Sequence, residues 1–322
     1  MIVALSGGVG GAKLALGLSR VLPPEELVVV VNTGDDFEHL GLSISPDIDT
    51  VLYTLSGLAN RELGWGRHDE TWSFMETMET LGGETWFRLG DRDLALHVER
   101  TRRLRLGESL SAVTADIARR MGIVPRIVPM TDDPVRTRLS TDAGWLDFQE
   151  YFVHRRCEPV VRELEFHGAA KARAHPDFLA ALADPRLEAV VICPSNPFIS
   201  VEPILAVPGV RAALAGSAAP VIAVSPIIAG RAVKGPTAKM MAELGLDASA
   251  GTRSFAPFSL VALAARYADL LDGYVIDNAD MSEVVSIDAK VTLAQTLMTT
   301  IEDREALART VLEAAAVLRR RR

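Results

Sequence analysis

The stretch MIVALSGGVGGAKLALGL at residues 1–18 decides the fold class of this chain. The apolar run at 2–5 predicts a buried strand, the glycines after it predict a tight turn, and the apolar spacing from residue 12 onward predicts a helix. Glycine lets the backbone approach a ligand closely, and free amides at the start of a helix attract negative charge. We therefore expect this turn to hold the phosphates of a nucleotide, although a turn without a ligand is the plainer alternative. The residues expected there are Gly7, Gly8, Gly10, Gly11 and Lys13.

The glycine turn departs from two well-known phosphate-binding patterns. The dinucleotide pattern G-x-G-x-x-G, started at Gly8, places Lys13 where glycine or alanine is required. The P-loop pattern requires glycine before its lysine and serine or threonine after it, but Ala12 and Leu14 flank Lys13. A nicotinamide dehydrogenase and a P-loop nucleotidase therefore both lose support.

Four further apolar runs resemble the first one, at 27–31, 189–193, 220–224 and 273–276. Strands that are buried on both faces of a parallel sheet read as continuous apolar runs. The predicted fold class is α/β and Rossmann-like, a mainly parallel sheet with flanking helices. Residues 1–64 and 166–322 are expected to form the nucleotide-binding α/β domain. Amphipathic helical patterns dominate 65–165, which predicts a largely helical insertion domain over the nucleotide sheet.

Composition narrows the class of partner. The chain has 322 residues and a net charge of -8, which argues against a broad nucleic-acid surface and favours a small-molecule substrate. Only Cys157 and Cys193 are present, so we expect no disulfide framework, and a reducing, cytoplasmic location fits. No apolar run approaches the length of a membrane span, so we expect no membrane partner.

Acidic residues follow the second apolar run, in VNTGDDFEHLGLSISPDIDTVLYTL at 31–55. This position is near the carboxyl edge of the sheet, where α/β proteins bind ligands. Two acids near one phosphate loop need a cation or a donor to offset their repulsion, and Mg²⁺ prefers carboxylates and phosphate oxygens. Asp35 and Asp49 are therefore predicted as catalytic residues and magnesium ligands. Asp36 is expected in a turn, and Asp47 is expected to cap the helix that begins near residue 48.

Three later segments carry candidate ligand-binding groups. Arg88 lies beside two aromatic residues in WFRLGDRDLA (86–95) and suits a planar ligand or a phosphate, with a solvated surface position as the alternative. Ser195 and Asn196 follow the run at 189–193 and suit a base or sugar. Lys234 and Gly235 precede a helix and suggest another anion site, or else a solvated loop. The histidines, His39 and His97 among them, have no metal-binding spacing and are expected to pack or lie on the surface.

Taken together, these segments resemble the 2-phospho-L-lactate transferase family (CofD/FbiA) of coenzyme F420 biosynthesis. The resemblance runs in order from residue 1 to about 242, with a weaker match at 296–308. The segments that carry it are SGGVGGAKLALGL, VNTGDDFEHLGLSISPDIDTVLYTL, ELGWGRHDETW, WFRLGDRDLA, TDDPVRTRL, PSNPFISVEPIL and SPIIAGRAVKGPTAKMM.

The resemblance implies transfer of a phospho-organic acid from a guanosine diphosphate conjugate to the ribityl hydroxyl of the deazaflavin Fo, with release of GMP. It also implies that Asp49 and Arg88 bind the deazaflavin, that the insertion at 65–165 covers this site, that Mg²⁺ assists, and that the protein is a homodimer. The acid stays open among phosphoenolpyruvate, 2-phospholactate and 3-phosphoglycerate. The excess of arginine over lysine suggests a GC-rich genome, which favours a bacterium and phosphoenolpyruvate.

One alternative from another functional class resembles part of the same pattern. The YvcK-like regulators bind nucleotide sugars without catalysis, and they share a glycine turn and a sheet of this kind. The stretch at 62–95, from ELGWGRHDETW through LGDRDLA, matches the transferases and has no reason to exist in the regulator. The transferase is therefore the favoured function.

Overall fold

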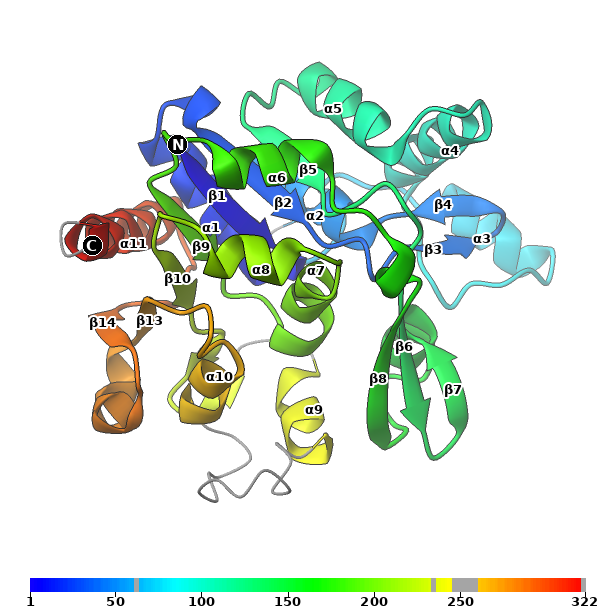
Figure 1. Ribbon diagram of the computed structural model, residues 1–322. Helices are drawn as coiled ribbons and strands as arrows, with labels where there is room; N and C mark the ends of the chain where they lie inside the picture. Colours follow the sequence, from blue (N-terminus) through cyan, green and yellow to red (C-terminus); the bar gives the residue numbers. More distant parts are fainter. Residues whose placement is uncertain (61–63, 233–235, 245–259, 320–322) are drawn as a thin grey trace.

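The computed structural model describes residues 1–60, 64–232, 236–244 and 260–319. At its centre is a parallel sheet of seven strands in the order β14-β13-β10-β9-β1-β2-β5 (Figure 1). All five predicted strands belong to this sheet, and the predicted Rossmann-like α/β fold class is confirmed. The strands are β1 (Ile2–Ser6), β2 (Leu27–Val31), β5 (Arg126–Pro129), β9 (Ala189–Ile192), β10 (Val221–Val224), β13 (Gly273–Asp277) and β14 (Lys290–Ala294).

The central strand β1 shows why the apolar runs are continuous. Successive side chains of a strand point to opposite faces of the sheet. Val3 and Leu5 pack into one hydrophobic layer, whereas Ile2 and Ala4 pack into the other. Because both faces are covered, every residue of β1 is buried.

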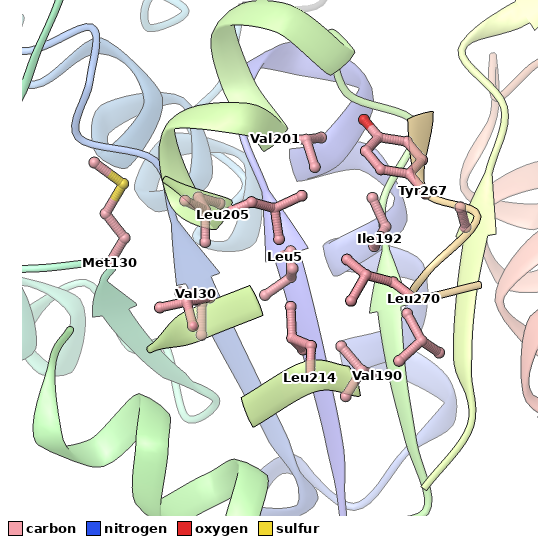
Figure 2. Packing of buried hydrophobic residues seen from close by; sticks show 14 of the residues in the cluster. Leu5, Val30, Met130, Val190, Ile192, Val201, Leu205, Leu214, Tyr267 and Leu270 are labelled. Atoms are coloured by element: carbon pink, nitrogen blue, oxygen red, sulfur yellow. The ribbon is translucent and has the colours of Figure 1, made fainter. Parts of the chain in front are cut away.

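Helices cover both faces of the sheet. The face that carries Ile2 is covered by α1 (Gly8–Val21), α2 (Pro46–Leu55), α5 (Leu110–Arg120) and α11 (Ile301–Arg319), with α1 packed between α2 and α11. The other face is covered by α6 (Pro176–Ala183), η4 (Pro197–Val201), α7 (Glu202–Leu205), α8 (Val210–Ala215), α9 (Thr237–Glu243) and α10 (Leu260–Arg266). Figure 2 shows this second layer, where Leu205 and Leu214 meet Leu5 and Val190 of the sheet. No helix within the described ranges combines the length and apolar composition needed to cross a bilayer.

The remaining elements lie outside the main sheet and its covering helices. The hairpin β3 (Phe37–His39) and β4 (Leu42–Ile44) packs with α3 (Ser73–Thr80) and α4 (Asp91–Arg105). A separate antiparallel sheet contains β6 (Arg136–Thr141), β7 (Gly144–Asp147) and β8 (Val161–His167). The remaining short elements are η1 (Pro24–Glu26), η2 (Glu150–His154), η3 (Ala169–Lys171), β11 (Ile227–Ile228), β12 (Arg231–Ala232) and η6 (Asn278–Ser286).

The segment 65–165 is less helical than its sequence suggests. It contains α3, α4 and α5, but also β6, β7 and the start of β8, and its strand β5 pairs with β2 in the main sheet. The physical reason is that β6 is mostly polar even where its side chains are buried, so its alternation of half-buried and buried residues gives a weak apolar pattern. The division into an α/β domain and an insertion stays a prediction.

Candidate functional site

A cavity of about 740 Å³ lies at the carboxyl edge of the sheet. This is where ligands bind in open α/β sheets, and the volume is typical of a ligand pocket. The structure brings most of the predicted site residues together there, namely Gly7, Gly8, Gly10, Lys13, Asp35, Asp49, Arg88, Ser195 and Asn196. Gly11 is buried beside them, and Lys234 and Gly235 lie outside the described residues.

The glycine turn packs closely against the loop after β9. A Cβ on Gly10 would lie 2.2 Å from the carbonyl oxygen of Pro194, and one on Gly11 would lie 2.6 Å from the hydroxyl of Ser195. Two amides of the turn already have partners, because Gly7 donates to Ser195 Oγ at 3.2 Å and Gly8 to Asp47 Oδ1 at 2.6 Å. Val9 and Gly10 also line the cavity, so the next amides of the helix start are where an anion would bind.

Asp47 corrects the expectation that it caps its own helix. Helix α2 begins at Pro46 after Ser45, and no side chain caps it. Asp47 instead reaches across to the first turn of α1, and its Oδ2 accepts a hydrogen bond from Asn32 Nδ2 at 2.9 Å. Burial raises the pKa of Asp47 to about 6, and the hydrogen bonds from Asn32 and Gly8 oppose that rise. A carboxylate therefore lies at the helix start predicted for phosphate.

Asp35 has the features of a cation ligand. It is buried at the cavity wall, and its Oδ1 has no hydrogen-bond partner among the described residues. Burial, followed by the charges of Asp47 and Asp36, raises the pKa of Asp35 well above its ordinary value. A divalent cation would relieve this repulsion, and Mg²⁺ needs only one or two carboxylates beside phosphate and water. No cluster of three or more histidine, cysteine or acidic side chains in the described ranges is arranged for a metal.

Asp49 has a partner that the sequence did not reveal. Arg100, on α4, donates both terminal nitrogens to the two carboxylate oxygens of Asp49, with Nη1 to Oδ2 at 3.0 Å. Since Asp49 already has a cationic partner, Asp35 fits the magnesium role better than Asp49 does. Arg100 is one of five arginines between 92 and 105, and nothing in their spacing shows which one turns inward.

Aromatic side chains form another part of the cavity wall. Trp65, Trp86, Phe87, Phe148 and Phe152 line the cavity. Next to them, the guanidinium of Arg88 lies 4.1 Å from the ring centroid of Trp72 and is exposed. A flat ring fits between such residues, because both aromatic faces and guanidinium groups stack on planar ligands.

Two further predicted residues link the cavity to the scaffold. Asn196 Oδ1 accepts from the amides of Phe198 and Ile199 at the start of η4, whereas its Nδ2 has no hydrogen-bond partner within the described residues. Lys13 Nζ donates to the carbonyl oxygen of Met298 at 2.7 Å, which ties the glycine turn to the segment after β14. The structure thus assigns Lys13 a structural contact, while the ligand-binding roles of these residues stay predictions.

Comparison with known proteins decides the family. The sequence model described as "2-phospho-L-lactate transferase CofD" matches residues 2–317. The chain belongs to the CofD family. A "Phosphoenolpyruvate transferase" of Kitasatospora aureofaciens is 41% identical, with 99% of this chain and 98% of the relative covered. A "2-phospho-L-lactate transferase" of Methanosarcina mazei is 38% identical, with 97% of this chain and all of the relative covered.

A solved structure supports the fold of this CofD-family chain. A member of the UPF0052 family from Bacillus halodurans superposes with a TM-score of 0.59 and covers 97% of this chain and 98% of its own. Its sequence identity is 12%, so this likeness concerns the fold alone.

Membership of the CofD family settles the functional class. The family description and the names of the relatives identify the protein as a transferase. The alternative of a regulator without catalysis is therefore not supported.

Proposed function

We propose that this CofD-family transferase moves a phospho-organic acid from its guanosine diphosphate conjugate to the ribityl hydroxyl of Fo (7,8-didemethyl-8-hydroxy-5-deazariboflavin). The hydroxyl oxygen forms a bond to the phosphorus that carries the acid, and the bond from that phosphorus to the bridging oxygen of GMP breaks. GMP leaves and the hydroxyl proton is released, so the product carries a phosphodiester. The reaction is a step in coenzyme F420 biosynthesis.

The observation that carries this proposal is the single cavity that joins two unlike surfaces. One surface is the glycine turn with its helix amides, which suits a diphosphate. The other is the aromatic wall with Arg88, which suits the flat ring of a deazaflavin. A transfer between two bound substrates needs both surfaces within one cavity, because catalysis of this kind is mainly positioning and charge stabilisation.

The residues of the cavity divide between the two substrates. The amides at Val9 and Gly10 would receive the diphosphate, and Ser195 and Asn196 would contact the nucleoside. Asp49 and Arg88 would hold the deazaflavin. Asp35 would hold Mg²⁺, which when bound offsets negative charge on the diphosphate.

The names of the relatives favour one donor acid. The relative at 41% identity is named for phosphoenolpyruvate, and the one at 38% for 2-phospholactate. We therefore propose phosphoenolpyruvate as the acid, with 2-phospholactate as the nearest alternative and 3-phosphoglycerate as the third.

Mass spectrometry of the product tests the proposal. The protein, Fo and Mg²⁺ are mixed with one guanylated acid at a time, in three separate reactions. We expect the Fo phosphodiester of phosphoenolpyruvate to form fastest, and the Asp35→Ala and Asp49→Ala variants to lose most of that rate. A faster product from another acid would correct the donor, and full activity of both variants would refute their roles.

A further inference from the structure

Five buried or half-buried polar side chains form a continuous network at the wall of the cavity, and four of them line the cavity itself. Asp49 and Tyr53 come from α2, four residues apart, and Asp93, His97 and Arg100 come from α4, four and three residues apart. These spacings place each set on one face of its helix, and the two faces meet in the structure. The hydroxyl of Tyr53 donates to Asp93, and Arg100 donates to Asp49.

Arg100 is the charged centre of this network. Its side chain is 1% exposed, and it does not line the cavity, whereas Asp49 does. A buried guanidinium is costly unless its charge is paired. Burial alone would lower the pKa of Arg100, but the charge of Asp49 and the hydrogen bonds to it outweigh burial and raise that pKa. The side chain that fixes Asp49 therefore lies outside the reach of any substrate in the cavity.

His97 is a second neighbour of the Arg100 guanidinium. Its Nδ1 lies 3.4 Å from Arg100 Nη1, and its Nε2 lies 3.0 Å from Asp93 Oδ2. Because arginine only donates, a hydrogen bond from Arg100 to Nδ1 requires the ring hydrogen to lie on Nε2, which faces the Asp93 carboxylate. His97 is buried, as expected of a packing residue, and both of its ring nitrogens lie close to charged side chains.

We propose that Arg100 is a positioning residue, which acts through Asp49 to hold the acceptor substrate and is itself oriented by His97. The inference rests on the proposed function, because it takes Asp49 as a contact of the deazaflavin. A planar guanidinium that bonds both oxygens fixes the plane of the carboxylate as well as its place. Loss of these two hydrogen bonds would leave the Asp49 carboxylate present but wrongly oriented. The affinity for the acceptor would then fall, while the affinity for the donor would not.

The test compares Arg100→Met and Arg100→Lys with Arg102→Met, an exposed arginine of the same helix that pairs with Glu99. Affinity for Fo is measured by its fluorescence, and affinity for GDP by calorimetry, at a temperature where each variant is folded. We expect Arg100→Met to weaken Fo binding about tenfold or more, as loss of charge-assisted hydrogen bonds would. Arg100→Lys keeps the positive charge but cannot bond both carboxylate oxygens in the same way. Its affinity for Fo should lie between those of Arg100→Met and the wild type. GDP affinity should change less than about twofold in all three variants, and Arg102→Met should bind Fo like the wild type.

A double-mutant cycle separates action through Asp49 from a general loss of structure. In an Asp49→Asn background, Arg100→Met should change Fo affinity by less than about twofold. An equal loss of Fo and GDP affinity in Arg100→Met and Arg100→Lys, or no loss of either, would overturn the proposal. If Arg100→Met does not fold, Arg100→Lys carries the test. A wild-type protein that binds Fo but transfers nothing would refute the proposed function, while the binding cycle still decides the role of Arg100.

Discussion

Asp47 lies in the first turn of α2, yet its carboxylate binds the first turn of α1. An anion that binds at the glycine turn therefore approaches a carboxylate that is already bonded to Gly8. Like charges in one buried site repel, and a cation or neutralisation relieves that repulsion. The affinity of the turn for a diphosphate should accordingly depend on the charge of Asp47.

Asp47→Asn tests this dependence. The amide oxygen of asparagine can still accept from Gly8, but the negative charge is lost. We expect the variant to bind GDP more tightly than the wild type. Both affinities are measured by calorimetry in buffer that contains a chelator to remove Mg²⁺. Weaker or unchanged binding would show that the charge of Asp47 does not oppose the phosphates.

Asp36 predicts how stability depends on pH. Burial raises the pKa of Asp36 from 3.8 to about 7, although Arg136 and the hydroxyl of Ser45 lower it. The folded protein therefore binds this proton more tightly than the unfolded chain does. Its stabilising contribution is complete below the unfolded pKa and is lost as the pH rises through about 7, by up to about 1.4 kcal/mol per pH unit.

Asp36→Asn removes that titration and should flatten the profile. Thermal unfolding in chelator is measured at several pH values across the range from about 5 to about 8. We expect a higher Tm than the wild type at the alkaline end and a smaller difference at the acidic end. A Tm difference that is constant across this pH range would contradict the raised pKa of Asp36.

The predicted elements show which patterns a sequence reveals. The five predicted strands are buried on both faces, and their apolar runs are unmistakable for that reason. The two strands that were missed, β5 and β14, lie at the two edges of the sheet and begin with the exposed residues Arg126 and Lys290. An edge strand needs fewer apolar residues, so its pattern merges with that of a loop.

The site residues that the sequence predicts are likewise those that belong to a clear local pattern. The glycine turn, Asp35, Asp49 and Arg88 lie in short motifs, and the structure brings them to one cavity. Arg100 and His97 belong to a helix whose polar residues look solvated, and only the packing of α4 on the hairpin that leads into α2 turns them inward. Local sequence carries no signal for a contact across 51 residues.

Helix α1 crosses α11 at a glycine, which gives a prediction at the level of the element. A Cβ on Gly17 would lie 2.2 Å from the backbone oxygen of Arg304, so one helix must move. Gly17→Ala gains about 1 kcal/mol of helix propensity, but overpacking against backbone should cost about 3 kcal/mol. We expect a net loss in the free energy of unfolding, measured with urea.

Gly216→Ala is the matched control. Gly216 ends α8 in a right-handed conformation, and its Cβ would lie 3.2 Å from the nearest oxygen. This substitution should leave stability nearly unchanged. If Gly17→Ala were as stable as the control, the tight crossing of α1 and α11 would be refuted.

At the scale of the whole molecule, the homodimer stays a prediction of the family resemblance. The chain mass is 34.7 kDa. Sedimentation equilibrium of the purified protein should give twice this mass over a wide concentration range. A single chain mass at all concentrations would refute the dimer.

The proposed transfer requires the whole molecule to hold both substrates in one cavity at the same time. The most direct measurement is GMP release from guanylated phosphoenolpyruvate and Mg²⁺, with and without Fo, together with the amount of Fo consumed. The account predicts GMP release that requires Fo and equals the Fo consumed. GMP release that proceeds equally without Fo, or no release from any of the three guanylated acids, would contradict it.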